Sequence, residues 1–319
     1  MTFVRTVLGD VPSAELGFCY AHEHVVIDRS FTTAITPDFL LEDVDRAVTE
    51  LQRFHADGGR AMIDSMPCDA GRNVLKLAAI SRRSRVHLVC PTGLHLAKYY
   101  DPGHWGNSYD EGELGALFEA DIRDGIDARD YNGPNVRRTA HRAGVIKVAT
   151  DRSFTSREER VFAAAASAHR ATGCPILTHT EQGTLGLEQV ERLRQFDVDL
   201  THVCLSHTDR NPDLGYHRAL LATGVRLEFD SAFRWKSAEG NPTRDLLLAL
   251  LGDFPDQLML GMDAARRSYW RSYEGHPGMS YLINDFVPQL RTAGVTDDAL
   301  RKIFVTTPAT TFSFAQPRI

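Results

Sequence analysis

The sequence lacks the features of several classes of protein. None of its apolar runs approaches the roughly 18–20 residues that a membrane-spanning helix needs. The N-terminal segment, MTFVRTVLGDVPSAELG, has no long apolar core of the kind found in signal peptides. Basic residues do not dominate, since 36 Lys and Arg stand against 42 Asp and Glu and give a net charge of −6. Such a charge does not attract a nucleic-acid backbone. We therefore expect a cytoplasmic protein that binds neither membranes nor nucleic acids.

Cysteine is also scarce. The chain has five cysteines, an odd number, and they show no CxxC spacing. Most of them lie in apolar runs typical of strands, which favours buried free thiols over disulfides or thiolate metal ligands. The sequence has no Gly/Ser-rich tract and no block of like charges that would indicate a linker. We expect a single domain that spans residues 1–319.

What the sequence does have is a regular alternation of short apolar runs with longer segments of helical period. The predicted strands are 17–24, 60–66, 86–93, 144–150, 174–180, 203–209, 225–230 and 258–263. The predicted helices are 41–57, 71–83, 110–128, 156–172, 184–195, 212–222, 243–252 and 278–293, with a C-terminal helical tail over 296–314. Eight such units predict an α/β fold of the (β/α)8 TIM-barrel type, with an open doubly wound sheet as the alternative. Ser156 followed by Glu159 predicts a capping box at the start of one helix.

Polar side chains occur at or near the ends of five predicted strands. They are His22, His24, Lys147, His179, His207 and Asp263. Each alone has a structural explanation, because a histidine at a strand end is commonly a hydrogen-bonded structural residue and an aspartate is commonly a helix cap. The carboxyl ends of the strands meet at one mouth of a barrel, and four imidazoles with a carboxylate suit divalent ions there. The sequence therefore predicts two divalent metal ions, zinc first, with manganese or cobalt as alternatives.

Lys147 needs its own explanation, because metal ions repel an ammonium group and burial lowers the pKa of a lysine. A neutral lysine amine can take up carbon dioxide and become a carbamate, N6-carboxylysine, whose two oxygens can bridge two metals. Two divalent ions with this carbamate, Asp263 and a bridging hydroxide leave a charge of about +1, which suits an anionic transition state. The alternative is a lysine that binds substrate directly.

The motifs resemble those of the phosphotriesterase-like family of the amidohydrolase superfamily. The similarity covers nearly the whole chain, through TVLGDVPSAELG, GFCYAHEH, AGVIKVAT, LTHT, LSHTD and GMD, in order and at family-like spacing. The resemblance implies that His22, His24 and Asp263 hold the more buried metal and that His179 and His207 hold the more exposed one. It also implies that the carboxylated Lys147 and a hydroxide bridge the metals, that the hydroxide attacks the substrate, and that Asp263 takes its proton.

The sequence departs from this family at two places. Cys19 and Tyr20 stand where the first motif usually has Thr-Leu. Triesterases of the family have a His–Asp relay behind the metal-bound aspartate, and the corresponding positions here are Ser231 and Arg210. This departure argues against phosphotriester hydrolysis as the native activity.

The loops after the strands carry cations and tyrosines, whereas a neutral triester would need an apolar pocket. Arginine forks and a tyrosine hydroxyl suit a phosphate or a carboxylate, and barrels often hold a phosphate with the loops after strands seven and eight. The predicted substrate-binding residues are Lys236, Arg266, Tyr269, Arg267 and Tyr99. The arrangement of the first three resembles the branch of the family that opens phosphorylated sugar lactones. Alternatively, these are surface charges paired with Glu239, Glu274 or Asp285.

The sequence predicts a metal-dependent hydrolase that opens a lactone ring by attack of a metal-bridging hydroxide. The expected substrate is a small molecule with an anionic handle, of the class of phosphorylated sugar lactones. The alternatives with the same metal centre are a carboxylesterase, an N-acyl amide hydrolase and a phosphotriesterase. Rivals from other classes are a metal-free sugar-phosphate isomerase and a binding protein without catalysis. Among the other polar residues, His95 is a further candidate for the site, Asp64 and Asp230 are expected behind the ligands or as caps, and a homodimer is a family-level expectation.

Overall fold

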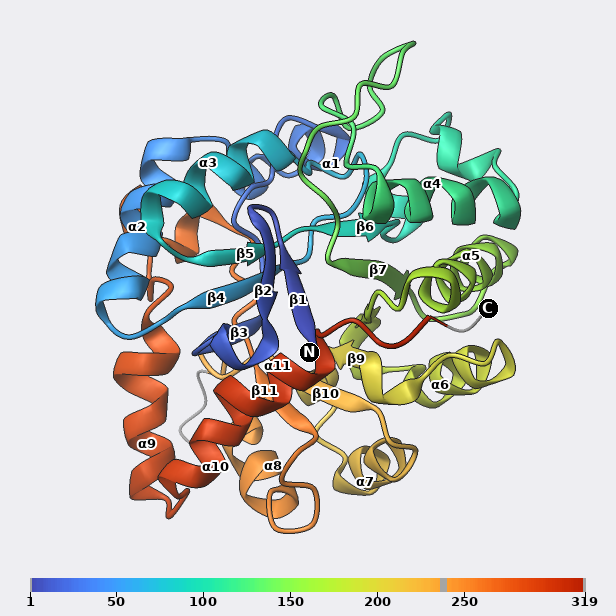
Figure 1. The fold of residues 1–319 in the computed structure, drawn as a ribbon. Helices are drawn as coiled ribbons and strands as arrows, with labels where there is room; N and C mark the ends of the chain where they lie inside the picture. The colour runs from blue at the N-terminus through green and yellow to red at the C-terminus, as the bar shows by residue number, and fades with distance from the viewer. Residues whose placement is uncertain (1, 236–239, 318–319) are drawn as a thin grey trace.

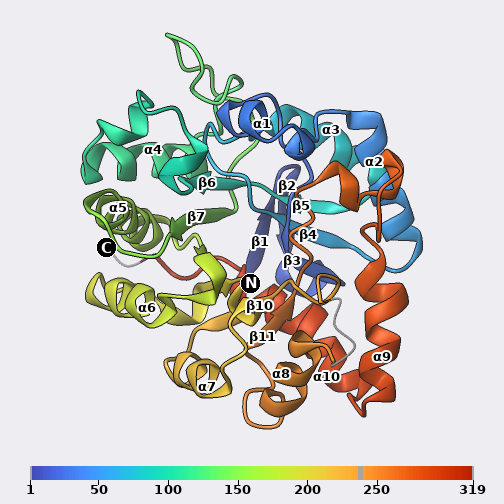
Figure 2. The same ribbon diagram turned by 180° about the vertical axis from the view of Figure 1, so that it is seen from behind.

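Parallel strands form the centre of the molecule and helices surround them (Figures 1 and 2). The computed structural model describes residues 2–235 and 240–317. Within these residues the central strands are β3 (Cys19–Glu23), β4 (Ala61–Asp64), β5 (His87–Val89), β6 (Pro91–Gly93), β7 (Val145–Thr150), β8 (Ile176–Thr180), β9 (Val203–Ser206), β10 (Arg226–Phe229) and β11 (Leu258–Leu260). Every one of the predicted strand runs contains one of these strands, and the run 86–93 contains both β5 and β6.

The strands follow one another around a barrel in chain order. β3, β4 and β5 pair in parallel, and so do β6 through β11, each with the next. β5 and β6 are two parts of one strand interrupted at Cys90, so they join the two sheets. At the other seam the backbone N–H of Asp263, just after β11, donates to the carbonyl of His22 in β3 over 3.1 Å. The predicted (β/α)8 barrel is confirmed.

The helices cover the outside of the barrel between successive strands (Figure 1). They are α1 (Phe31–Ile35), α2 (Val44–Ala56), α3 (Val74–Ser84), α4 (Glu111–Arg123), α5 (Ser156–Thr172), α6 (Gly186–Gln195), α7 (Leu214–Ala222) and α8 (Pro242–Leu250). The tail contains a π-helix η10 (Leu282–Phe286), α9 (Val287–Thr292), α10 (Asp297–Arg301), a second π-helix η11 (Lys302–Thr306) and α11 (Thr307–Thr311). The short 3-10 helices are η1 (Ser13–Glu15), η2 (Pro37–Phe39), η3 (Ala97–Tyr99), η4 (Trp105–Asn107), η5 (Glu181–Gly183), η6 (Leu200–His202), η7 (Thr208–Arg210), η8 (Arg267–Tyr269) and η9 (Arg271–Tyr273).

Two local predictions need correction. The capping box of α5 is formed by Thr155 and Glu158, one residue before the predicted pair Ser156 and Glu159. The predicted helix 110–128 ends at Arg123, because Gly125 has a φ of +114° that an α-helix cannot accommodate. The expected helical tail after residue 296 is confirmed.

An antiparallel hairpin that the sequence patterns did not predict covers the bottom of the barrel. It consists of β1 (Phe3–Thr6) and β2 (Gly9–Pro12), and Val4 also bridges to Ser313 beyond α11. Val4 and Phe312 belong, fully buried, to the apolar cluster that fills the barrel interior. The five cysteines are free and buried, as predicted. None of the described helices combines the length and the apolar character that crossing a membrane would require.

Candidate metal centre and substrate pocket

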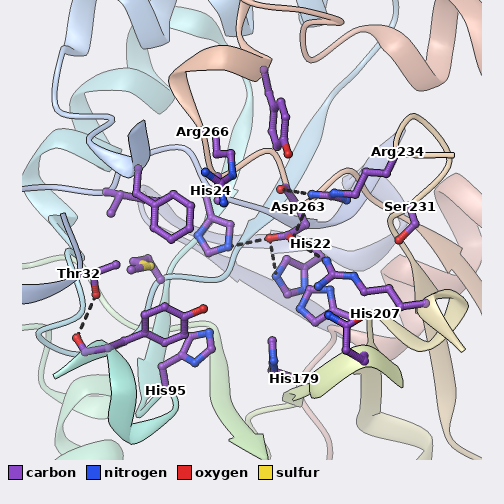
Figure 3. A pocket seen from close by; sticks show the side chains of 18 of the residues that line it. His22, His24, Thr32, His95, His179, His207, Ser231, Arg234, Asp263 and Arg266 are labelled. Atoms are coloured by element: carbon purple, nitrogen blue, oxygen red, sulfur yellow. Dashed lines mark hydrogen bonds and ion pairs between the residues drawn. The ribbon is translucent and has the colours of Figure 1, made fainter. Parts of the chain in front are cut away.

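Residues that are far apart in the sequence meet at the carboxyl ends of the strands (Figure 3). His22 lies in β3 and His24 directly after it, His179 lies in β8, His207 follows β9, and Asp263 follows β11. Asp263 Oδ1 is 3.1 Å from His24 Nε2 and 3.8 Å from His22 Nε2. The ring of His207 lies 4.6 Å, centroid to centroid, from the rings of both His22 and His179. The five predicted ligands therefore surround one space.

Lys147, the sixth predicted ligand, lies in β7 and is fully buried. Burial has the largest effect on the pKa of His22 and of His179, and the positive charge of Lys147 lowers both pKa values further. The Lys147 amine therefore lies near both rings. The backbone at this point is crowded, since a Cβ on Gly93 of β6 would lie 1.9 Å from the Lys147 carbonyl oxygen. The barrel therefore holds this lysine beside the histidines through its backbone.

Hydrogen bonds fix the orientation of three imidazoles. His22 Nδ1 bonds the hydroxyl of Ser206 over 2.7 Å, and His207 Nδ1 bonds Asp230. His179 differs, because its Nε2 bonds Glu181 over 3.1 Å. In each ring one nitrogen is engaged from behind, which leaves Nε2 of His22, Nε2 of His207 and Nδ1 of His179 available to a ligand.

A buried atom without a partner supports the fit of these residues to a metal centre. Within the described residues, Lys147 Nζ is buried and has no hydrogen-bond partner. Buried polar groups seldom stay unpaired, so this atom indicates a modification or an ion beside it. The ligating atoms of His22, His24 and Asp263 lie within 4.8 Å of one another. Imidazole nitrogens with a carboxylate are the donor set that zinc and similar ions prefer.

Burial and neighbouring charges shift the pKa values of these groups, and they keep His207 and Asp263 in the forms that bind metals. Burial lowers the pKa of His207 to about 3 and that of Lys147 to about 8. Burial alone would raise the pKa of Asp263, but the hydrogen bond from His24 and the charges of His207, Arg234 and Arg210 hold it well below its usual range. Near neutral pH the imidazole of His207 is therefore neutral and the carboxylate of Asp263 is ionised.

Sequence reasoning missed Glu228 of β10. Its side chain is fully buried, both of its oxygens lack hydrogen-bond partners among the described residues, and Oε2 lies 3.8 Å from His22 Nδ1. It forms a second compact group with His22, His207 and Asp230. The signal was present as an acidic residue inside the apolar run VRLEFD.

The four histidines and Asp263 line a cavity of about 400 Å³, and Lys147 is not among its lining residues. Of the predicted substrate-binding residues, Arg266, Tyr269 and Tyr99 line this cavity, and so does His95. Arg266 forms an ion pair with Asp38 over 3.6 Å and lies over the ring of Phe39. Asp38 was not among the acidic partners that the sequence suggested for the loop cations. Burial raises the pKa of Tyr99 to about 12, which keeps its hydroxyl protonated.

One of the predicted substrate-binding residues does not line the cavity. Arg267 is absent from the lining residues, because its Nε donates to the Leu40 carbonyl and its guanidinium lies over the Tyr273 ring. Lys236 falls outside the described residues. The wall next to Asp263 instead contains Arg210 and Arg234, both of which bond the Asp263 carboxylate.

The loop after β11, which carries Arg266 and Tyr269, is fastened to the outer ring of helices. Glu50 of α2 is buried, and its carboxylate accepts the backbone N–H groups of Arg271, Ser272 and Met279. Asp64 has a comparable structural role, since it accepts from the N–H groups of Val25 and Met66. These two carboxylates hold backbone that surrounds the pocket and do not point into it.

Known proteins resemble this chain over nearly its whole length. The sequence profile of the Phosphotriesterase family (PTE) matches residues 2–312. A phospho-furanose lactonase of Mycoplasmopsis agalactiae is 33% identical over 99% of this chain and 93% of its own length. The crystal structure of an amidohydrolase from Mycoplasma synoviae superposes with a TM-score of 0.94 at 31% identity, covering 99% of this chain and 93% of that one. A lactonase from Listeria monocytogenes gives a TM-score of 0.90 at 29% identity, covering 98% of this chain and 100% of that one.

Proposed function

The chain belongs to the phosphotriesterase family, and on that basis we propose that it is a metal-dependent hydrolase that opens the ring of a phosphorylated sugar lactone. The observation that carries the proposal is the division of one pocket into two parts. Histidines and Asp263 form its floor, whereas Arg266 and Tyr269 lie on its wall. The floor suits a reacting carbonyl group, and the wall suits a phosphate that is bound but does not react. Two relatives named phospho-furanose lactonase support this choice.

Two divalent ions, zinc first, would be held by His22, His24 and Asp263 on one side and by His179 and His207 on the other. A carboxylated Lys147 would be shared between them. Such ions supply a Lewis acid for the lactone carbonyl and lower the pKa of an attacking water. The ordered hydrogen bonds behind His22, His179 and His207 keep the ligand nitrogens in place while the substrate enters and leaves.

Asp263 is the residue that moves the proton. Its Oδ2 is engaged by Arg210 and Arg234, and its Oδ1 faces His22 and His24. The carboxylate accepts the proton that the attacking water loses and delivers it to the ring oxygen as the lactone opens. The low pKa of this carboxyl keeps it ionised before the reaction and makes it a weak base, so the proton stays on it only briefly before it passes to the leaving oxygen.

Arg266 and Tyr269 bind the phosphate, and apolar side chains including Phe39 and Met66 exclude water from the rest of the pocket. Arg210 stands where the triesterases of this family have a carboxylate of their relay, which argues against the triesterase alternative. Esters and N-acyl amides are the nearest competing substrates because they react through the same carbonyl chemistry.

The test is a substrate panel on zinc-loaded protein. It compares phosphorylated sugar lactones with their unphosphorylated counterparts, and adds simple esters, N-acyl amides and a phosphotriester. We expect the phosphate to raise kcat/KM by about 10–100-fold, mostly through KM, because it contributes binding away from the reacting bond. Rapid turnover of the triester or the amides without lactone hydrolysis would overturn the proposal.

A pair of neighbouring substitutions sharpens this test. Arg266→Met should abolish most of the preference for the phosphorylated lactone, because Arg266 lines the cavity. Arg267→Met should leave that preference intact, because Arg267 points at Leu40 and Tyr273. The ratio of kcat/KM for the two lactones is measured in each variant. Equal losses of the ratio in both variants would contradict the assignment of Arg266.

A further inference from the structure

One guanidinium group connects two of the residues around the candidate metal centre. Nη2 of Arg210, which ends the 3-10 helix η7, lies 2.7 Å from Asp263 Oδ2 and 2.8 Å from Asp230 Oδ1. Asp263 belongs to the half of the site that contains His22 and His24, whereas Asp230 holds His207 of the other half. Arg210 therefore contacts the supports of both halves at once.

The contact with Asp263 decides which of its oxygens faces the cavity. Oδ2 accepts from Arg210 over 2.7 Å and from Arg234 over 3.2 Å, so Oδ1 is the oxygen directed at His24. A carboxylate held in this way can offer one oxygen to an ion but cannot turn to offer both. Charge-assisted hydrogen bonds to a planar guanidinium are directional enough to impose this restriction.

The contact with Asp230 decides which nitrogen of His207 faces the cavity. Asp230 is fully buried, and its two oxygens have different partners. Oδ1 accepts a hydrogen bond from Arg210, and Oδ2 is hydrogen-bonded to His207 Nδ1. Because Arg210 holds Oδ1, Asp230 keeps Oδ2 directed at the Nδ1 edge of His207. His207 Nδ1 then donates to Asp230, and Nε2 is the nitrogen left for the cavity.

Arg234 shares this network but is attached differently. Its closest contact with Asp263 is to the backbone carbonyl, over 2.7 Å, and its carboxylate contacts are longer, 3.2 Å to Asp263 and 3.3 Å to Asp230. Its guanidinium also lies over the rings of Phe233 and Tyr269. Arg234 is therefore anchored mainly to backbone and aromatic rings, whereas Arg210 is anchored to the two carboxylates.

We propose that Arg210 is a positioning residue for the hydrolysis, because it makes Asp263 present a single oxygen and makes His207 present Nε2 in one concerted arrangement. This proposal rests on the proposed function of the same site. Both bonds of Arg210 come from one nitrogen, Nη2, whose two N–H groups lie in the plane of the guanidinium.

The first experiment uses Co²⁺ as a spectroscopic probe in the parent protein and in Arg210→Met. The visible absorption of Co²⁺ weakens as its coordination number rises. We expect weaker absorption in the variant, because Asp263 Oδ2 is then held only by the longer contact with Arg234 and Asp263 can bind through both oxygens. We also expect a kcat for lactone hydrolysis that is about 10–100-fold lower with KM changed by less than about threefold, as for other residues that orient metal ligands.

A second measurement needs neither metal nor substrate. In the metal-free protein with ¹⁵N-labelled histidine, His207 should carry its proton on Nδ1 in the parent and should populate both tautomers in Arg210→Met. If Arg210→Met does not fold, Arg210→Lys serves in its place, because it keeps the charge and replaces the planar N–H groups with a rotating ammonium group. The matched control is Arg218→Met. It removes an exposed arginine of α7 that pairs with Asp253, and it should change neither the spectrum nor kcat.

Two results would overturn the proposal. One is a folded variant whose Co²⁺ spectrum, His207 tautomer and kcat all match the parent. The other is a raised KM with an unchanged spectrum and tautomer, which would mean that Arg210 binds substrate directly. Failure of the parent to hydrolyse any lactone would instead refute the proposed function, and the Co²⁺ spectrum and tautomer would still test Arg210.

Discussion

At the scale of single residues, Lys147 is the most unusual feature of the barrel. It is fully buried, its Nζ has no hydrogen-bond partner among the described residues, and its pKa is lowered to about 8 by burial. An unpaired buried ammonium is costly, whereas a carbamate coordinated by two cations satisfies both oxygens. These features support the carbamate form of Lys147 that we propose.

Lys147→Ala should lower lactone hydrolysis by at least about 1,000-fold, because the variant loses the anion that the proposed site shares between two ions. A short carboxylic acid added to this variant should restore part of the activity by entering the vacated space. Initial rates with and without the acid, and zinc content, are the measurements. Lys302→Ala, which removes a peripheral ion pair with Asp256, is the control and should behave as the parent. Full activity of Lys147→Ala without the acid would show that Lys147 is not a ligand.

Glu181 gives a pH-dependent prediction. The hydrogen bond with His179, with a smaller effect from Lys98, lowers the pKa of Glu181 from 4.5 to about 2. A carboxyl whose pKa is lower in the folded state stabilises the fold above its unfolded pKa, and this stabilisation is lost as the pH falls through the folded pKa. In metal-free protein, Glu181→Gln should reduce the free energy of unfolding by about 1–2 kcal/mol at about pH 6, after allowance for solvent screening.

Below the unfolded pKa of 4.5 this difference between the parent and Glu181→Gln should shrink steadily towards about pH 3. Urea titrations at several pH values measure it. Glu191→Gln, which removes an exposed carboxylate of α6, should differ from the parent by less than about 0.5 kcal/mol throughout. A difference for Glu181→Gln that grows as the pH falls would contradict the assigned direction.

At the scale of elements, the close approach of β6 to β7 positions Lys147. Gly93 has a φ of +98°, and a Cβ there would lie 1.9 Å from the Lys147 carbonyl oxygen. Gly294 has nearly the same φ, +95°, but a Cβ there would meet no atom within 4 Å, so this glycine isolates the effect of the backbone conformation.

Gly93→Ala should therefore reduce the free energy of unfolding by about 3 kcal/mol or more, whereas Gly294→Ala should cost about 1–2 kcal/mol. Chemical denaturation of both variants measures this, and zinc content shows whether Lys147 has moved. Equal costs for the two substitutions would mean that the barrel relaxes freely around Gly93.

The elements also show which features the sequence could predict. Strand positions and the gathering of histidines followed from apolar runs that end in polar residues, and the structure has the strands where these runs predicted them. The hairpin β1–β2 was missed because GDVP in β2 alternates with little apolar content and pairs only with its neighbour β1. The position of the α5 capping box was wrong by one residue because Thr155 and Ser156 are both good caps and both have a glutamate three residues later.

Contacts that depend on side-chain direction could not be predicted in this way. Arg266 and Arg267 are adjacent, yet one lines the cavity and the other points at Leu40, since the short helix η8 turns them apart. The contacts of Arg210 with Asp230 and Asp263 join three strand ends, and no local pattern encodes such a meeting. Sequence spacing predicts which strand a residue follows, but the direction of its side chain depends on the folded loop.

At the scale of the whole molecule, the two ends of the barrel have separate roles. The cavity with its histidines lies at the carboxyl ends of the strands, and the apolar cluster with Val4 and Phe312 fills the other end. This separation predicts that stability can be changed without changing the chemistry.

Phe312→Ala should reduce the free energy of unfolding by about 3–5 kcal/mol, because it removes a fully buried ring. The kcat and zinc content of the folded protein should remain those of the parent. Thermal denaturation and kinetics below the transition test both statements. Leu248→Ala, at an exposed position of α8, should change stability by less than about 0.5 kcal/mol. A drop in kcat for folded Phe312→Ala would show that the two ends of the barrel are coupled.

Glu50 of α2 holds the loop that carries Arg266 and Tyr269 through three backbone N–H groups, from outside the pocket. Substrate preference can therefore drift during evolution through changes in an outer helix that leave every pocket residue intact. A laboratory search for new substrates could begin at Glu50 and its surroundings, where loosening one anchor would let the loop sample new shapes above an unaltered metal centre.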